Sequence, residues 1–286
     1  MGPKADYSRT KDGDWSLWTL HGSWNQELWR TVFALIEEQP FSKHPQTLRL
    51  HARDMAGGKV LFLKVFHGSA GLGGLKNVFR ESKALRSMRQ AAALARANFN
   101  VPTTVASGEK RRHRLLRKAF LLTLEVNAQP LPSFLGDLLR EARTISIPEK
   151  RVDLAQLAAE VRRLHGLGFV HGDLVPTNIL VSRAFGKQSR FVFMDNDRTR
   201  RYPSWLPQTL WRRNLVQLNR MPLPGITLQD RLRFLKHYLG SQEWAGQKRH
   251  WVSWLERKTR QRRKECDAVD SSGSFRRLMR WNDRLS

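Results

Sequence analysis

One polar loop, HGDLVPTNIL at residues 171–180, constrains the fold of this chain more than any other stretch. Its His171, Asp173 and Asn178 stand among apolar residues, directly after a segment (149–168) whose apolar residues recur at helical spacing. Two short apolar runs follow, NILVS and RFVFMD, and these predict strands that pair with each other. A polar loop between a long helix and a small hairpin favours a catalytic loop over a plain turn.

The residue types in and after this loop suit phosphate transfer. Asp173 is placed to accept a proton from a substrate hydroxyl, and the amide oxygen of Asn178 is a potential cation ligand. A second carboxylate, Asp195 in FMDNDR, would face the same pocket if the two strands pair. Carboxylate and amide oxygens are hard ligands that suit Mg²⁺. The three residues therefore predict phosphoryl transfer, in which positioning and charge neutralisation supply most of the catalysis. Asp197 is either a third acidic residue of this site or a partner for a nearby arginine.

A charged pair is expected upstream of the loop. Lys64 lies in the middle of the apolar run LFLKVF, where a lysine is costly to bury unless it is paired. Glu81 follows in FRESKAL, within a predicted helix at 77–98, and we expect it to pair with Lys64. The paired lysine would then contact the phosphates of a nucleotide. The alternatives are a surface lysine that extends along its strand and a glutamate on a solvated helix face.

Changes of periodicity divide the chain into two lobes. Residues 47–66 predict a hairpin with its turn at Gly57-Gly58, and VPTTVASGE and KAFLLTLEV predict two further strands. The proline-marked segment QPLPSF follows as a hinge, and the second half has mainly helical patterns. The expected fold class is α+β, with an N-terminal extension (1–46), a small β-rich N-lobe (47–130), a larger helical C-lobe (131–240) and a basic, Trp-rich C-terminal tail (241–286).

The charge of the chain restricts its partners. Its 51 Lys and Arg against 25 Asp and Glu give a net charge of +26, which favours a polyanion: nucleic acid, an anionic membrane surface or a phosphorylated glycolipid. A surface that is merely solubilising is the alternative. The single cysteine, Cys266, excludes a disulfide framework, and the polar N-terminus does not resemble a signal peptide, so we expect a cytoplasmic protein.

The tail combines tryptophans with cations. Trp251 and Trp254 lie among the Lys and Arg residues of 248–264. This composition suits contact with an anionic membrane surface, and it equally suits a basic helix docked on its own domain through the Trp face. The chain contains no recognisable nucleic-acid-binding module, so we do not expect nucleic acid as the partner.

Four segments in this order, VLFLKVF, FRES, HGDLVPTNIL and FMDNDR, resemble the protein-kinase-like fold. HGD in place of HRD is more similar to kinases of small molecules and sugars than to protein kinases. RTRRYPSWLPQTLWRRNLVQLNR and GITLQDRLRFLKHYLG resemble the C-terminal helices of bacterial lipopolysaccharide kinases, which phosphorylate 3-deoxy-D-manno-octulosonic acid or heptose of the inner core.

The resemblance implies a role for each residue of the site. Asp173 would be the catalytic base, Asn178 and Asp195 the Mg²⁺ ligands, Lys64 the contact to the phosphates of ATP with Glu81 as its partner, and His171 the residue that orients the loop from beneath. It also implies an anionic glycolipid, the lipopolysaccharide core, as substrate, and a cytoplasmic protein that is peripheral at the inner membrane.

The chain departs from the kinase pattern in one respect. No GxGxxG motif precedes Lys64, and the glycines of GSAGLGGLK (68–76) come after the lysine strand, where a flexible loop is expected rather than a phosphate cradle. A kinase of another small molecule or of protein remains an alternative, as does a catalytically inactive kinase-like membrane adaptor.

Overall fold

The structure is a computed structural model that describes residues 7–51, 59–68, 80–140, 147–183, 188–203, 205–206 and 209–269. The chain forms two compact units. Unit 1 comprises Met1–Asn127 and Phe193–Arg198, and unit 2 comprises Ala128–Val192 and Thr199–Ser286. Unit 1 is built on an antiparallel sheet and unit 2 is mostly helical. This arrangement matches the expected α+β class, with a β-rich N-lobe and a helical C-lobe.

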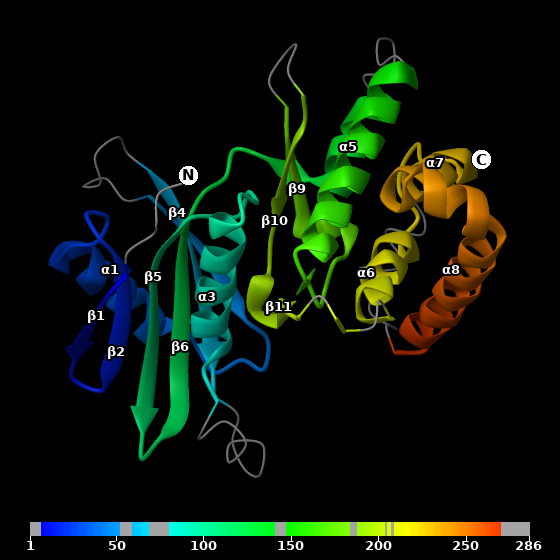
Figure 1. The fold of residues 1–286 in the computed structure, drawn as a ribbon. Helices are drawn as coiled ribbons and strands as arrows, with labels where there is room; N and C mark the ends of the chain where they lie inside the picture. Colours follow the sequence, from blue (N-terminus) through cyan, green and yellow to red (C-terminus); the bar gives the residue numbers. More distant parts are fainter. Residues whose placement is uncertain are drawn as a thin grey trace. The chain divides into compact units, whose positions relative to one another are not determined.

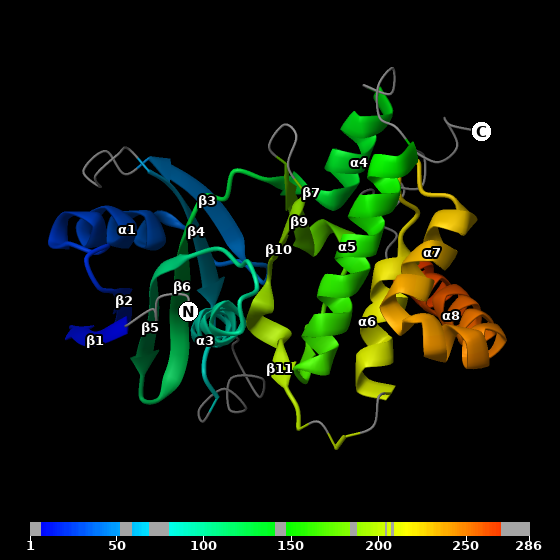
Figure 2. The same cartoon turned by 45° about the horizontal axis from the view of Figure 1, so that its top comes forward.

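Unit 1 contains a six-stranded antiparallel sheet with the order β1-β2-β5-β6-β4-β3, which Figure 1 shows together with its helices. The strands are β1 (Tyr7–Asp12), β2 (Trp15–Leu20), β3 (Gln46–His51), β4 (Val60–His67), β5 (Thr104–Arg112) and β6 (Leu115–Leu124). The helices are α1 (Gln26–Glu38), α3 (Lys83–Arg96) and the short 3₁₀ turn η2 (Asn196–Arg198). Because α1 and α3 pack in separate core clusters, they cover opposite faces of the sheet (Figure 2).

The alternation of β4 places Lys64 on the face that α3 covers. Leu61, Leu63 and Val65 are fully buried in the core beneath α1. Side chains alternate between the two faces of a strand, so Lys64 and Phe66 point the other way. Phe66 packs in the cluster that includes Leu85 and Met88 of α3. The strand thus carries its lysine to the α3 side of the sheet.

The N-terminal residues belong to the sheet and not to an extension. We expected a boundary at residue 46, but β2 pairs with β5, and Trp15 and Leu17 of β2 are 3% exposed in the core of unit 1. Residues 193–198 also belong to unit 1, although the sequence assigned them to the C-lobe. The polar pattern of β1 concealed this edge strand, because five of its six residues are exposed.

Unit 2 is a set of helices with two small sheets. Its helices are α4 (Leu131–Arg140), α5 (Ile147–Gly166), the 3₁₀ turn η1 (Pro176–Asn178), α6 (Thr209–Arg220), α7 (Leu228–Leu239) and α8 (Ser241–Val269). Its strands are β7 (Gln129–Pro130), β8 (Phe169–Val170), β9 (Ile179–Ser182), β10 (Arg190–Phe193) and β11 (Arg200–Arg201). The expected hairpin after the polar loop is present, since β9 lies between β10 and β7 in one sheet, while β8 pairs with β11.

The basic tail forms α8, which docks on unit 2 through its tryptophan face. α8 packs against α6 and α7, and Trp251 is only 3% exposed. The guanidinium of Arg212 in α6 lies 4.5 Å from the ring centroid of Trp251 and 5.5 Å from that of Trp254. The structure therefore shows the second of the two interpretations of the tail, a basic helix docked through its Trp face. Within the described ranges, no helix combines the length and the apolar character that a membrane span requires.

Two expected features fall on residues that the structure does not describe. The turn at Gly57-Gly58 joins β3 to β4, and GSAGLGGLK follows β4 with only its first glycine among the described residues. The turn and the remainder of GSAGLGGLK lie outside the described residues.

Candidate active site

Lys64 and Asp195, which both belong to unit 1, form an ion pair. The Nζ atom of Lys64 on β4 donates a hydrogen bond of 2.5 Å to Oδ1 of Asp195, just before η2. The side chain of Lys64 is 26% exposed and that of Asp195 is 47% exposed. The pair is therefore open to a ligand, and it compensates the charge of a lysine that stands in an apolar strand.

Asp195 lies in a sharp backbone turn that orients its carboxylate. Asp195 has a φ of 52°, in the left-handed region that few non-glycine residues adopt. The turn is fixed on both sides, because Asn196 Nδ2 donates to the carbonyl of Phe193 at 3.0 Å and the Phe193 N–H donates to the carbonyl of Asn100 at 2.9 Å. Backbone strain of this kind persists where surrounding contacts enforce it, and it often marks functional sites.

Asp197 places a second carboxyl in the same turn. Burial raises the pKa of the half-buried Asp197 carboxyl above its usual value, against the attraction of Arg198, and the Asp195 carboxylate raises it further. The Arg86 side chain on α3 donates from Nε to the main-chain carbonyl of Asp197 at 3.4 Å and from Nη1 to the carbonyl of Glu81 at 2.9 Å. Arg86 thus fastens the turn to the start of α3.

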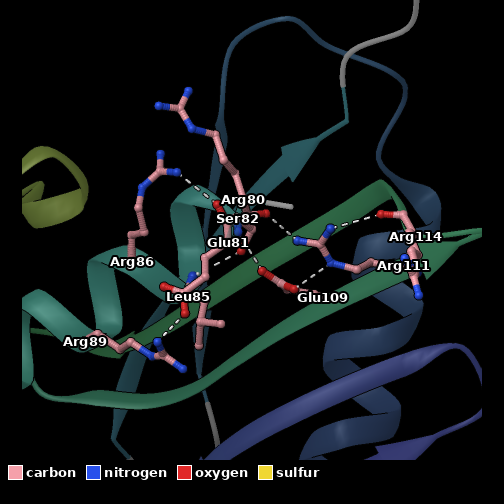
Figure 3. A network of polar contacts seen from close by, with 9 residues as sticks. All are labelled: Arg80, Glu81, Ser82, Leu85, Arg86, Arg89, Glu109, Arg111 and Arg114. Atoms are coloured by element: carbon pink, nitrogen blue, oxygen red, sulfur yellow. Dashed lines mark hydrogen bonds and ion pairs between the residues drawn. The ribbon is translucent and has the colours of Figure 1, made fainter. Parts of the chain in front are cut away.

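The expected pairing of Lys64 with Glu81 is corrected by the structure. Glu81 precedes the N-cap of α3, and its carboxylate pairs with Arg89 on that helix (Figure 3). Lys64 pairs instead with Asp195. The helix begins at Lys83, six residues later than the start of the predicted helix, so Glu81 lies outside it. The local attraction of Arg89 accounts for the position of this carboxylate.

A buried glutamate on the sheet anchors the start of α3. Glu109 on β5 accepts hydrogen bonds from the N–H of Ser82, the N-cap residue, at 2.6 Å and from Nε of Arg111 at 2.8 Å (Figure 3). Burial alone would raise the pKa of Glu109, but the hydrogen bonds from Arg111 and Ser82 outweigh it and hold the pKa below its usual range. Glu109 therefore remains ionised and ties the N-terminus of the helix to the sheet.

The polar loop of unit 2 is organised by its own amide. Asn178 Nδ2 donates to the main-chain carbonyl of Asp173 at 3.0 Å, and the N–H of Val175 donates to the same carbonyl at 2.9 Å. The Asn178 amide nitrogen is thus directed at the loop backbone, and its oxygen is the atom suited to a cation. The side chains of Asp173 and Asn178 are half-buried, and Gly172 has a φ of 78°, which favours glycine.

Two amide side chains of α6 hold the backbone of this loop. Asn214 Oδ1 accepts from the N–H of His171 at 3.0 Å, and Gln217 Oε1 accepts from the N–H of Leu174 at 3.1 Å. Gln217 Nε2 donates to the carbonyl of Gly172 at 2.9 Å, and Asn214 Nδ2 donates to Gln217 Oε1 at 2.8 Å. The backbone on both sides of Asp173 is therefore clamped, which leaves the Asp173 carboxylate on a rigid support.

A histidine and a tyrosine continue this network. The ring of His165 lies between the Tyr238 hydroxyl, 2.8 Å from Nδ1, and Asn214 Oδ1, 3.1 Å from Nε2. Because Asn214 Oδ1 only accepts, Nε2 carries the proton and Nδ1 accepts from Tyr238. Burial lowers the pKa of His165 to about 4, although the hydrogen bond with Asn214 opposes this, and burial raises the pKa of Tyr238. Both groups are neutral near pH 7.

The residues expected at the site fall into two groups. Lys64 and Asp195 meet in unit 1, whereas Asp173, Asn178 and the fully buried His171 share the loop of unit 2. Sequence reasoning did not identify the clamp from α6. Its signal was present, because Asn214 and Gln217 interrupt an apolar helix face that also carries Trp211 and Leu215. Polar residues buried on such a face indicate a specific hydrogen-bond requirement.

Comparisons with known proteins bear on the family and the fold of the chain. The lipopolysaccharide kinase (Kdo/WaaP) family profile matches residues 71–238, which is more than half of the chain. The solved structure of WaaP in complex with acyl carrier protein is 21% identical, with a TM-score of 0.60 over 82% of this chain and 95% of that chain. This likeness shows the protein-kinase-like fold that the sequence predicted.

A curated relative matches a shorter part of the chain. Human serine/threonine-protein kinase ULK1 is 42% identical over 55 residues, which span 19% of this chain and 5% of the length of ULK1. The segment is too small a part of ULK1 to say what the whole chain acts on. The family match covers the loop at 171–180 and the hairpin that follows it, but not the strand that carries Lys64. Because it spans more than half of the chain, the chain belongs to the lipopolysaccharide kinase (Kdo/WaaP) family, whose members are phosphotransferases.

Proposed function

We propose that this chain transfers the γ-phosphate of ATP to a hydroxyl group of the lipopolysaccharide inner core, on 3-deoxy-D-manno-octulosonic acid or heptose. The observation that carries the proposal is the 2.5 Å contact between Lys64 and Asp195, which are 131 positions apart in the sequence. A strand lysine beside a carboxylate is an arrangement that binds a nucleotide through its phosphates and their cation.

In this proposal Asp173 is the catalytic base. Its carboxylate takes the proton of the acceptor hydroxyl as the hydroxyl oxygen attacks the γ-phosphorus, the bond to the β-phosphate oxygen breaks, and ADP leaves. The half-buried carboxylate and the hydrogen bonds from Asn178 and Val175 to the Asp173 carbonyl support this role, because proton transfer requires a fixed position. His171 supports the loop from beneath through its buried side chain.

The residues suit a Mg²⁺ ion carried by ATP. Asp195 already accepts a cationic group, the ammonium of Lys64, and Asn178 offers its amide oxygen while its nitrogen is bound to the loop. When bound, Mg²⁺ supplies neutralisation of phosphate charge. Asn178 and Asp195 would be its protein ligands, and Lys64 would contact the phosphates. Glu81 is tied to Arg89, so its contribution to the ATP site is to hold the start of α3.

Two alternatives give different results. A kinase of another small molecule or of protein would keep all of these residues and differ in its acceptor. An inactive kinase-like adaptor has no use for Lys64, Asp173, Asn178 and Asp195 together, so their joint presence disfavours it. The strong positive charge favours an anionic acceptor such as the lipopolysaccharide core over a cationic small molecule.

We also propose that the protein acts at the cytoplasmic face of the inner membrane and contacts this membrane peripherally. Because Trp251 is buried against α6 and α7, contact would be made by charge and not by inserted tryptophan rings. Exposed cations recur along the outward side of α8 at Arg249, Arg257 and Lys264. Their helical positions lie within one face, which suits anionic headgroups.

The direct test is transfer of labelled γ-phosphate from ATP to purified lipopolysaccharide core oligosaccharide. We expect incorporation that requires Mg²⁺ and is lost in Asp173→Asn. ATP binding without transfer to this acceptor, but with transfer to a protein or another sugar, would move the function to the first alternative. A thermal shift with Mg²⁺ and ATP that is absent altogether would favour the adaptor.

A further inference from the structure

A short segment of unit 2 runs directly beside the loop that bears Asp173. Thr199 Oγ1 donates to the carbonyl of His171 at 3.2 Å, and the N–H of Tyr202 donates to the carbonyl of Gly168 at 2.8 Å. Between them β11 pairs with β8 in antiparallel register, with Arg200 opposite Val170. The pair lies at the C-terminal end of α5 (Figure 2). Residues 199–202 are therefore fixed to the backbone that leads into the catalytic loop.

The approach of the two backbones is close enough to require glycine. A Cβ atom at Gly168 would lie 2.2 Å from the carbonyl oxygen of Tyr202, and Gly168 has a φ of 82°. Both observations exclude an ordinary side chain at this position. The segment is thus pressed against the loop and positioned with it.

The two arginines of β11 have different surroundings. The Arg201 side chain contacts its own unit: its guanidinium lies 5.5 Å from the ring centroid of Phe169, and its Nε donates to the carbonyl of Leu167 at 3.2 Å. Arg200 is exposed, and within the described part of the chain its guanidinium has no hydrogen bond or ion pair. An uncompensated guanidinium on the residue opposite Val170, which directly precedes the segment HGD, is well placed to bind a carboxylate or a phosphate in two-point fashion.

A tryptophan lies a few residues further along. Trp205 is 79% exposed, the highest value among the large hydrophobic side chains of the described residues. A lone exposed apolar side chain needs no explanation. Here Trp205 follows, three positions after Tyr202, the segment 199–202 that carries the free Arg200 guanidinium and is bonded to the backbone leading into the catalytic loop. The polarised C–H groups on one face of a sugar ring pack well on the negative face of an aromatic ring.

We propose that Arg200 and Trp205 form the acceptor-recognition site of this kinase, with Arg200 binding a carboxylate or phosphate group of an anionic sugar and Trp205 stacking on a sugar ring. This inference rests on the proposed function, because it assigns the acceptor to an anionic saccharide. The inference also explains how the chain selects its acceptor. The segment that binds the sugar is hydrogen-bonded to the backbone leading into the loop of Asp173, which accepts the proton of the sugar hydroxyl. Binding energy at this segment therefore places the hydroxyl relative to Asp173.

The test is calorimetric binding of the delipidated core oligosaccharide to the full chain without ATP. Arg200→Ala should weaken binding by about tenfold or more, since it removes a charge-assisted two-point contact. Trp205→Ala should weaken it and Trp205→Phe should largely restore it. Arg151→Ala removes an exposed cation of α5 in the same unit and serves as the matched control, with wild-type affinity expected. The affinity for Mg²⁺ and ATP should not change in any of these variants.

A chemically altered ligand identifies the group that Arg200 binds. Core oligosaccharide that has been dephosphorylated and carboxyl-reduced should bind the wild type as weakly as the native oligosaccharide binds Arg200→Ala, and the substitution should then have no further effect. Equal affinity of wild type and Arg200→Ala for the native oligosaccharide would overturn the inference. So would a Trp205→Ala variant that binds the sugar normally and loses only its binding to lipid vesicles.

These results are separate from those that decide the proposed function. Wild-type protein that binds the oligosaccharide through Arg200 but never transfers phosphate to it would contradict the catalytic proposal and leave the recognition site standing. Wild-type protein that does not bind the native core oligosaccharide at all would overturn the recognition site.

Discussion

The Nζ atom of Lys64 and a carboxylate oxygen of Asp195 lie 2.5 Å apart, although 131 positions separate these residues in the sequence. The pair is partly exposed, so it is worth little to stability, typically less than about 1 kcal/mol. The geometry of the pair is set by the strained turn at Asp195 and by the strand that carries Lys64. An arrangement that contributes little to folding and is nevertheless specified on both sides points to a role in binding.

Lys64→Met and Asp195→Asn should each abolish phosphate transfer while the free energy of unfolding changes by no more than about 1 kcal/mol. Lys64 is needed for the phosphates and Asp195 for the cation, so both variants should lose the thermal shift with Mg²⁺ and ATP. Denaturant unfolding and the ligand-induced shift measure the two effects. Lys110→Met breaks an exposed pair with Glu37 in the same unit and is the control that should keep activity. Full activity in Lys64→Met would contradict its role.

Gln217→Leu should reduce kcat by at least about tenfold and destabilise the protein by about 1–3 kcal/mol. The substitution removes the acceptor for the Leu174 N–H and the donor to the Gly172 carbonyl, and both groups flank Asp173. The KM for ATP should change little, because the loop and not the nucleotide site is loosened. Gln217→Glu keeps the acceptor and should rescue part of kcat.

The matched control for this experiment is Gln247→Leu, which replaces an exposed glutamine on α8. It should change neither kcat nor the free energy of unfolding by a measurable amount. A Gln217→Leu variant with wild-type kcat would show that the α6 clamp stabilises the fold without positioning the catalytic loop.

Acid should destabilise the protein through His165. The pKa of His165 is about 4 in the folded chain against an ordinary value of 6.5, so between these pH values the unfolded chain binds more protons. The free energy of unfolding should therefore fall as the pH drops from 6.5 to 4, by on the order of 3 kcal/mol from this group, and level off below pH 4. His165→Gln should flatten this part of the profile. His237→Gln, at an exposed position of α7, should leave the profile unchanged, and an equal slope in His165→Gln and wild type would contradict the assignment.

Membrane contact should depend on the outward face of α8. Replacing Arg249 and Arg257 together by glutamate should sharply weaken binding to vesicles that contain phosphatidylglycerol, since each cation near an anionic surface contributes about 1 kcal/mol. Vesicles of phosphatidylcholine alone should bind neither protein. Arg30→Glu alters an exposed cation of α1 and should bind as the wild type does. Vesicle binding that survives the double substitution would place the contact elsewhere.

The sequence predicted the parts of the site that local pattern encodes. HGDLVPTNIL was identifiable because its polar residues interrupt apolar surroundings, and Lys64 because it interrupts an apolar strand. The partner of Lys64 was not identifiable in this way, since Glu81 and Asp195 are equally plausible by charge, and only the fold directs Glu81 to Arg89. A partner choice between distant charges depends on tertiary contacts that spacing does not encode.

The same distinction applies to the fold. The two lobes and the hairpin after the loop follow from periodicity, whereas β1 and β2 were taken for an extension. β2 has the alternation of a half-buried strand, with Trp15 and Leu17 inward, but its sheet partner β5 lies about ninety positions further on, and non-local pairing of this kind leaves no local signal. The Asn214 and Gln217 clamp was missed for the same reason, because its partners are backbone groups of another segment.

Phosphate transfer to the lipopolysaccharide core is tested most directly by mass spectrometry of lipopolysaccharide from a deletion strain of the source organism that carries either the wild-type chain or Asp173→Asn. We expect that the deletion removes one phosphate from a defined core sugar, that the wild-type chain restores it, and that Asp173→Asn, although folded and present at equal level, does not. Restoration of the phosphate by Asp173→Asn, or a core that is unchanged by the deletion, would contradict it.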